Sequence, residues 1–435
     1  MKYLGIDWAE HEHAICLLDE QGERLAERTI PDTLAGYRVL QELVAEHAAE
    51  PEQVVIGIET EQGMLARVLR VGGYQLYAIN PVKANRYRER HKTSGAKSDP
   101  ADAKMLADLV RTDRHNHRMV AENSDEVSAL QVLTRAHQRL IWDRQRHCNR
   151  LRSTLRLYHP GMLAALVKKD LYAADSLALV QAAPTPQQGR QLRVDRIERV
   201  LRSGGRARGI RTSAEKIAAA LRCEQAPVSS IVAAAFGVEV AALVRLIGSL
   251  NGEIASLEET LGQQFEKHPD AEIILSLPGL KTVLGARVLA EFGDDPNRYA
   301  NSKARKCYAG TAPITRSSGL SRFVAARETR NSRLLDACFQ WARNAKLTSP
   351  GARRYYEQRK EKGKTHNQAV RALANRLVGI LHGCLLHRGL YEEATAWPVW
   401  EVLAEGASEP TNHHHKPLES TGGMICSQPT LAASI

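Results

Sequence analysis

The sequence predicts a mixed α/β domain over residues 1–125, followed by a mostly helical chain. Three observations lead to this prediction. Short apolar runs typical of strands recur in the first 80 residues, and turn residues such as Asp19-Glu20-Gln21-Gly22 separate them. Apolar residues at helical spacing fill the stretches between the later runs. After this region the pattern changes, because residues 126–158 contain neither Gly nor Pro and read as one long helix.

The elements of the first domain follow a recognisable order. Three strands, at residues 2–7, 13–18 and 24–30, form a hairpin meander. A helix at 33–50, a strand at 53–59, a helix at 64–71 and a strand at 74–79 come next, then a short basic helix and a helix that begins near Asp99. Three antiparallel strands followed by alternating helix and strand is the ribonuclease-H-like, or RuvC-like, order. A generic α/β domain with surface acids is the alternative.

Four acidic residues stand where this order would bring them together. Asp7 and Glu59 each end an apolar strand, and Asp99 and Asp102 lie three apart where a helix begins. Carboxylates at the ends of neighbouring strands, with a helical pair facing the same way, can hold hard divalent cations. The sequence therefore predicts a Mg²⁺ site made by Asp7, Glu59, Asp99 and Asp102.

Composition sets limits on the class of protein. The chain has 435 residues, 43% of them hydrophobic, which is enough for two or three domains with real cores. Its seven scattered cysteines, without a CxxC motif, favour reduced thiols in the cytoplasm and no zinc site. We expect no signal peptide, and no membrane span either, because the apolar run from Ile231 to Val244 is too short and contains Glu239.

The net charge of +11 is unevenly distributed along the chain. Residues 128–224 hold 19 Lys and Arg against 7 Asp and Glu, and residues 298–376 hold 19 against 4, whereas the remaining residues hold 22 against 38. Two basic blocks beside an acidic domain with a candidate metal site favour nucleic-acid phosphates as the partner, with solvated helix faces as the alternative.

The middle of the chain, residues 126–265, is predicted to be a helical and coiled-coil segment. Leu243, Ile247, Leu250, Ile254, Leu257 and Leu261 keep a heptad spacing. This stretch either pairs with a second copy of the chain or folds back on the helix at 126–158 as an antiparallel hairpin. Between the two helices, Gly204-Gly205 reads as a turn with arginines that contact phosphate, or as a plain loop. The arginines are Arg202, Arg206, Arg208 and Arg211.

Residues 266–396 are predicted to be a second chemical domain. The turn Leu277-Pro278-Gly279-Leu280-Lys281-Thr282 resembles a helix-hairpin-helix element, in which Gly279, Lys281 and Thr282 would grip a backbone phosphate. Further along, Ser317-Ser318-Gly319 forms a turn amid Arg316, Arg322, Arg327, Arg330 and Arg333. A serine there could attack phosphorus with guanidinium help, although such a turn is commonly only a turn.

Taken in order, several of these motifs resemble the DEDD transposases of the insertion-sequence 110 family, over about residues 1–390. The motifs are Gly5-Ile6-Asp7, Gly57-Ile58-Glu59-Thr60, Lys97-Ser98-Asp99-Pro100-Ala101-Asp102-Ala103, Leu277-Pro278-Gly279, Gly310 to Pro313 and Ser318-Gly319. The resemblance implies a DNA recombinase with a RuvC-like domain, a coiled coil and a transposase domain. It implies that the four acids bind Mg²⁺ and that Ser318 links covalently to DNA, with Ser317 as its neighbour. It also implies a structured guide RNA encoded by the element.

Two other functions remain open from the residues. One is a metal-dependent nuclease or junction resolvase that uses water as the nucleophile and needs no serine. The other is a non-enzymatic nucleic-acid binder, which the lack of glycine-rich phosphate loops of the actin type disfavours. Because the acids and the serine lie over 200 residues apart, they are expected to meet between subunits of a dimer or tetramer. Residues 397–435 are expected to be a disordered tail.

Overall fold

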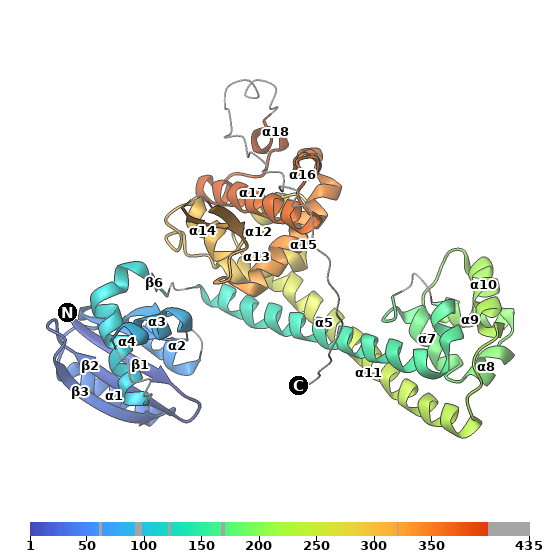
Figure 1. Cartoon of the computed structure of the whole chain (residues 1–435), viewed down its shortest axis with the longest axis horizontal. Helices are drawn as coiled ribbons and strands as arrows, with labels where there is room; N and C mark the ends of the chain where they lie inside the picture. Colours follow the sequence, from blue (N-terminus) through green and yellow to red (C-terminus); the bar gives the residue numbers. More distant parts are fainter. Residues whose placement is uncertain (61–62, 92–97, 121–122, 167–169, 320, 399–435) are drawn as a thin grey trace, which may run out of the picture.

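The computed structural model of the chain describes residues 1–60, 63–91, 98–120, 123–166, 170–319 and 321–398. Figure 1 shows an α/β domain at the N-terminus, a helical body formed by the last third of the described chain, and a separate helical lobe. Two long helices, α5 (Asp125–Tyr158) and α11 (Ser230–Phe265), run between the helical body and the lobe. Nearly all of the tail for which disorder was predicted lies outside the described residues.

The N-terminal domain is built on a six-stranded sheet of order β3-β2-β1-β4-β5-β6. β1 (Lys2–Trp8), β2 (Glu12–Leu18) and β3 (Arg24–Pro31) are antiparallel, whereas β4 (Val54–Ile58) and β5 (Gln75–Ala78) run parallel to β1. The five predicted strands are therefore present. The two-residue edge strand β6 (Arg118–Met119) carries no sequence pattern and was not predicted. The α/β class is confirmed, and the ribonuclease-H-like name for this sheet stays a prediction.

Helices cover both faces of the sheet because its central strands are apolar on both sides. Leu4, Ile6 and Ile56 pack on one face with α1 (Leu34–Ala45) and α2 (Met64–Val71). Tyr3 and Val55 point to the other face, where α4 (Asp99–Asp113) packs. α3 (Pro81–His91) lies against α4, and the short helices η1 (Pro51–Gln53) and η2 (Arg114–Asn116) complete the domain.

The long helices α5 and α11 pack against each other in antiparallel fashion. His137 contacts Glu258, and Arg144 donates a hydrogen bond to Asn251, so residue numbers rise on one helix as they fall on the other. The heptad residues Ile247, Ile254 and Leu261 are buried. Of the two alternatives for the heptads, the structure contains the intramolecular hairpin. Pairing between chains stays a prediction.

The separate lobe packs on the far half of this helix pair. It consists of α6 (Pro160–Ala165), α7 (Ala174–Ala182), α8 (Pro186–Gln191), α9 (Val194–Ser203) and α10 (Ile210–Arg222). Its apolar core contains Leu179, Ile197 and Leu221 together with Leu151 of α5 and Ile247 of α11.

The C-terminal body packs on the other end of the helix pair. It contains α12 (Ala271–Ser276), α13 (Thr282–Phe292), α14 (Ser302–Tyr308), the hairpin of β7 (Ile314–Ser318) and β8 (Ser321–Ala325), α15 (Ser332–Thr348), α16 (Pro350–Glu361), α17 (His366–His387) and α18 (Glu393–Ala396). The fully buried Trp341 is the largest side chain in its core, which also takes in Leu130 and Phe265 from α5 and α11.

An ion-pair network fixes this body to α5. Glu291 of α13 accepts hydrogen bonds from Arg135 of α5 and from Asn331. Burial opposes ionisation of Glu291, but these bonds and the charges of Arg135 and Arg333 hold the pKa of its carboxyl below the ordinary value.

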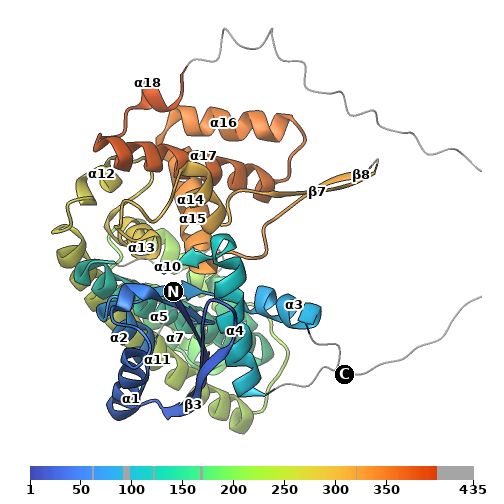
Figure 2. The same ribbon diagram turned by 90° about the vertical axis from the view of Figure 1, so that its left-hand side faces the viewer.

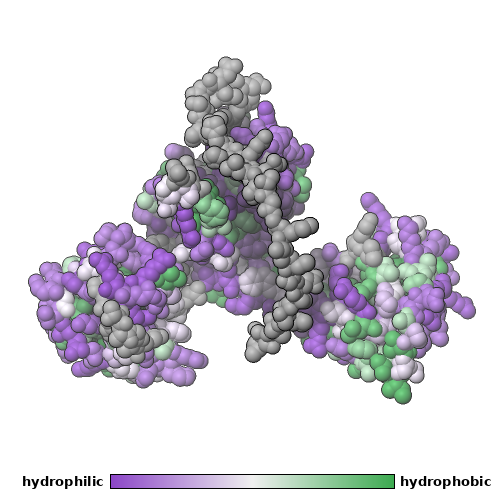
Figure 3. All heavy atoms as spheres, in the orientation of Figure 1, coloured by the Kyte–Doolittle hydropathy of each residue, from purple (hydrophilic) through white to green (hydrophobic). Residues whose placement is uncertain are grey.

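Two helices, α11 and α17, are long and apolar enough by composition to cross a membrane. One or two such helices are weak indications, because core helices of soluble proteins share these properties. Both pack inside the described chain, α11 against α5 and α17 against α14, α15 and α16. Apolar side chains nevertheless remain exposed where α11 begins, at Ile231 and Val238, and Figure 3 shows hydrophobic side chains over that end of the molecule.

Candidate functional site

Parallel pairing of β1 with β4 brings Asp7 and Glu59 to the same end of the sheet. Gly5 lies opposite Gly57, and Ile6 lies opposite Ile58, so that Asp7, the last residue but one of β1, and Glu59, directly after β4, come next to each other along the two strands. Side chains alternate between the faces of a sheet, and Asp7 and Glu59 therefore share the face of Gly5 and Gly57, which is the face that α4 covers. Both acids are half-buried.

The two glycines allow α4 to lie directly on the strands. A Cβ atom on Gly5 would come within 1.9 Å of the Ala103 carbonyl oxygen, and one on Gly57 within 2.7 Å of the Leu106 carbonyl oxygen. No side chain other than hydrogen fits at either position. The glycines thus set how closely α4 approaches the two strands that end in Asp7 and Glu59.

The direction of α4 places its first turn near these strand ends. At its carboxyl end, Arg111 bonds to the Glu20 carbonyl oxygen and Arg114 lies over the Tyr3 ring, both at the opposite end of the sheet. The amino end of α4 therefore lies on the side of Asp7. Asp99 occupies this first turn, exposed to solvent, and shares a helix face with Ala103 and Ala107.

Asp102 is placed differently from the other three acids. It is only 4% exposed, and its carboxylate accepts a hydrogen bond of 3.0 Å from Nε of Arg88 on α3 and lies 2.9 Å from Nη2 of the same guanidinium. It lines a cavity of about 460 Å³ together with Arg24 and Lys104. The sequence analysis missed Arg88 as the partner of Asp102, because nothing in the local pattern links the two positions.

The described residues contain no cluster of three or more His, Cys, Asp or Glu side chains arranged to hold a metal ion. The donor chemistry nevertheless suits Mg²⁺, which proteins commonly bind through one or two carboxylates and substrate phosphates. Asp7, Glu59 and Asp99 supply oxygen donors at one end of the sheet, whereas Asp102 would have to exchange Arg88 for the ion. These residues fit a Mg²⁺ site that nucleic acid completes.

Trp8 is a second residue at this end that sequence reasoning missed. It directly follows Asp7, is 43% exposed and stacks on the buried His13. An aromatic residue next to a strand-terminal acid is the signal that could have indicated it, because exposed rings beside nucleic-acid sites stack on bases.

The predicted serine turn lies on the β7–β8 hairpin. Figure 2 shows this hairpin projecting from the C-terminal body. Ser318 pairs with Ser321, whose hydroxyl donates to the Ser318 carbonyl oxygen, and Gly319 follows with φ of 54°. Both Ser317 and Ser318 are exposed, and neighbouring residues of a strand point to opposite faces, so that only one of the two hydroxyls can face a given phosphate.

The arginines expected around this serine are dispersed. Arg316 is exposed on β7, whereas Arg327 donates to the Cys307 sulfur and Arg330 packs over Gly310. Arg333 lies over the ring of Trp142 in α5, and burial lowers the pKa of its guanidinium. The side chain of Arg322 lies outside the described residues. Of these, Arg316 on β7 and Arg322, whose backbone on β8 pairs with Ser317, share the hairpin with Ser318.

Three of the four arginines at residues 202–211 are already paired with carboxylates of the lobe. Arg202 pairs with Glu198, Arg206 with Asp175, and Arg211 with Glu198 and two further acids. Arg208 is exposed. The positive charge available to a phosphate here is smaller than the sequence suggests.

The turn before α13 has a packing role. Gly279 has φ of 80°, and a Cβ atom there would come within 2.4 Å of the Ala345 backbone nitrogen. The Trp341 indole donates to the Pro278 carbonyl oxygen. Lys281 and Thr282, at the amino end of α13, remain accessible for the predicted phosphate contact.

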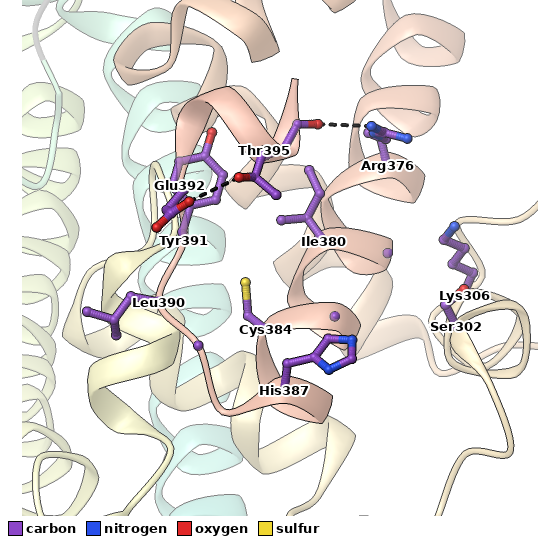
Figure 4. A pocket seen from close by; sticks show the side chains of 14 residues that line it. Ser302, Lys306, Arg376, Ile380, Cys384, His387, Leu390, Tyr391, Glu392 and Thr395 are labelled. Atoms are coloured by element: carbon purple, nitrogen blue, oxygen red, sulfur yellow. Dashed lines mark hydrogen bonds between the residues drawn. The ribbon is translucent and has the colours of Figure 1, made fainter. Parts of the chain in front are cut away.

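A cavity of about 440 Å³ lies in the C-terminal body between α14, α17 and the segment before α18 (Figure 4). Its lining carries both signs of charge, from Lys306 and Arg376 on one hand and Glu392 on the other. Arg376 of α17 donates to the Ala396 carbonyl oxygen, which ties α18 to α17, and Thr395 donates to Glu392 at the amino end of α18.

Comparison with known proteins adds sequence relationships. A family model for DEDD transposases of the IS110 group matches residues 4–160, and a model described as transposase of the IS116/IS110/IS902 family matches residues 271–357. A mini-circle protein of IS117 from Streptomyces coelicolor, which its name assigns as a transposase, is 42% identical over 92% of this chain and 98% of its own length. An insertion element IS900 protein of Mycobacterium paratuberculosis is 29% identical over 90% of this chain and 98% of its own length.

Proposed function

Because the chain belongs to the IS110 family of transposases, we propose that it cuts and rejoins DNA through a covalent phosphoserine intermediate at Ser318, with Mg²⁺ at the acid site. The observation that supports the proposal is the packing of α4 on Gly5 and Gly57, which turns the first turn of α4 toward the end of the sheet where Asp7 and Glu59 lie. Carboxylates near the ends of neighbouring parallel strands suit phosphoryl transfer once a nucleic-acid phosphate and the metal ion complete the site.

Asp7, Glu59, Asp99 and Asp102 would hold the ion, which would polarise the scissile phosphate. Ser318 supplies the nucleophile: its hydroxyl gives up its proton as Oγ forms a bond to phosphorus, the bond between phosphorus and the leaving sugar oxygen breaks, and that oxygen takes up a proton. The intermediate conserves the phosphoester bond energy for rejoining. The exposure of Ser318 on a projecting hairpin suits attack on a bound duplex.

The acids and Ser318 belong to different bodies of the chain, the sheet domain and the C-terminal hairpin. The proposal therefore includes a dimer or tetramer in which one subunit presents its hairpin to the acids of another. It also includes a structured guide RNA, DNA of the transposon ends and of the target, and action in the cytoplasm.

The experiment compares Ser318→Ala with Ser317→Ala on a DNA substrate, and looks for a protein–DNA adduct that survives denaturant. Ser318→Ala should abolish both adduct and recombination, whereas Ser317→Ala should keep at least part of each. Chelation of divalent ions should stop cleavage by the unmodified protein without releasing DNA. Efficient cleavage by the Ser318 variant would favour a nuclease that uses water.

A further inference from the structure

Helix α3 carries a stripe of positive charge that the basic blocks of the sequence do not include. Lys83, Arg86 and Arg90 are spaced by three and four residues, so they share one face of the helix, and all three are exposed. We call these residues the α3 stripe. In Figure 2, α3 projects on the same side of the molecule as the β7–β8 hairpin.

The stripe stands out because the domain around it is acidic. Residues 83–97 hold 6 Lys and Arg against 1 Glu, whereas the rest of residues 1–125 holds 10 against 20. An acidic domain repels a polyanion, and a local concentration of positive charge on α3 offsets that repulsion where a strand has to approach.

The stripe borders a groove between α3 and the carboxyl end of α4. The groove has a volume of about 380 Å³ and is lined by Lys83, Arg86 and Arg90 together with Tyr87 and His117. Within the part of the chain that the structure describes, neither Arg86 nor Arg90 has an ion-pair partner. Two of the three cations are thus available to an anionic ligand.

One carboxylate, Asp113, also lines the groove beside two histidines. Asp113 lies 3.6 Å from His115 and 3.7 Å from His117. Burial, followed by the charge of Lys83, lowers the pKa of His117, so its ring is a neutral part of the groove wall at physiological pH. Lys83 itself donates to the Asn116 carbonyl oxygen, which fixes its position at one end of the groove.

Three contacts give the direction of the stripe. Lys83 contacts Asn116, Tyr87 bonds to Asp108, and Arg88 bonds to Asp102, so α3 runs antiparallel to α4. The stripe therefore leads toward the amino end of α4, where Asp99 lies. The seven residue steps from Lys83 to Arg90 cover about 10 Å of helix, which is roughly three times the axial spacing of phosphates along one strand.

We propose that the α3 stripe binds the phosphodiester backbone of the nucleic-acid strand that enters the acid site. The direction toward Asp7 and Asp99 rests on the proposed function, whereas phosphate binding stands on charge and geometry alone. A DNA strand and an RNA strand share this chemistry, and the experiment distinguishes them.

The test replaces Lys83, Arg86 and Arg90 with Gln in the full chain. The control variant also loses three positive charges, at exposed positions of the same domain. Its changes are Arg28→Gln on β3, and Arg38→Gln on α1 and Arg67→Gln on α2, the two helices of the opposite face. Binding of a short single-stranded DNA, its duplex and the matching RNA is measured across salt concentrations. We expect the stripe variant to lower the slope of log affinity against log salt by about 2, and the control to leave it nearly unchanged.

Weakened binding of DNA alone identifies the cut strand as the ligand, weakened binding of RNA alone identifies the guide, and both results support the stripe. If the two triple variants change the salt dependence of binding equally, the proposal that the α3 stripe binds phosphates is wrong. If the stripe variant melts at lower temperature, Arg86→Gln with Arg90→Gln keeps the bond of Lys83 to Asn116 and is measured instead. Cleavage by Asp7→Asn tests the proposed function separately, since that change leaves the stripe intact.

Discussion

The acid end of the N-terminal sheet and the serine hairpin are stabilised in opposite ways. Asp7 lies near the carboxyl end of buried β1 and Glu59 directly follows buried β4, and the fit of α4 on Gly5 and Gly57 fixes their surroundings. Ser318 lies on a two-stranded hairpin whose Phe323 and Val324 are 64% and 50% exposed. Packing determines the first site, and little beyond the strand pairing determines the second.

Because of this difference, we expect substitutions at the two sites to affect folding stability and catalytic activity differently. Substitutions beneath the acid site should lower folding stability and activity together, because the glycines and α4 serve both. Substitutions on the hairpin should alter activity while the melting temperature stays nearly constant.

The largest effect is expected from Asp7→Asn, which keeps the size of the side chain and removes its charge. Cleavage should fall by at least roughly 10³-fold, about 4 kcal/mol of transition-state stabilisation, because a hard cation loses an anionic ligand. DNA binding should change little. A strand-cleavage assay measures the activity, and filter binding measures the affinity for DNA. The control is Glu23→Gln, which removes an exposed carboxylate at the other end of the sheet. Full recombination activity of Asp7→Asn would contradict the assignment of Asp7 to a metal-binding site.

Gly5→Ala should cost about 3 kcal/mol of unfolding free energy, because the new methyl group overlaps the Ala103 carbonyl oxygen and the Ala107 nitrogen. Gly248→Ala is the contrasting change, since that helical glycine has open space around it and alanine favours helix by about 1 kcal/mol. Denaturant unfolding of both variants checks the difference. Equal stability of the two would show that α4 does not rest on β1 as described.

The sequence predicted the elements near the acids well because each had its own local signal. The strands ending in Asp7 and Glu59 are short apolar runs, and α4 begins at Asp99, where Ser98 and Pro100 mark a helix start. The ion pair of Asp102 with Arg88 was not predictable, since it depends on how α3 lies against α4. The same holds for Arg202, Arg206 and Arg211, whose carboxylate partners come from α7, α9 and α10.

The middle of the chain shows a different limit of sequence reasoning. The heptads at 243–261 specified a buried seam without specifying its partner, because a/d spacing suits a helix from the same chain as well as from another. Leu130 and Phe265, at the ends of the long helices, belong to the core of the C-terminal body, a tertiary relationship with no local pattern.

Ile247→Ala tests which partner the seam has. Ile247 is fully buried in the core that α11 shares with α5 and the lobe, so its truncation should cost about 2 kcal/mol of unfolding free energy. The neighbouring Leu246 is 50% exposed, and Leu246→Ala should cost far less. Light scattering should show an unchanged mass for Ile247→Ala. A lower mass with unchanged stability would mean that the seam pairs two chains.

The smallest change in stability is expected from Gly319→Ala, on the hairpin itself. Gly319 has φ of 54°, and an added Cβ atom would meet nothing within 4 Å, so only backbone strain of about 1 kcal/mol opposes alanine. That strain acts on the residue next to Ser318, and we expect adduct formation to fall roughly fivefold while the melting temperature of the whole chain hardly moves. Gly319→Asn is the matched control, because asparagine tolerates this conformation and should restore much of the adduct. A large drop in melting temperature with Gly319→Ala would show that the hairpin packs on something, and the contrast between the two sites would then fail.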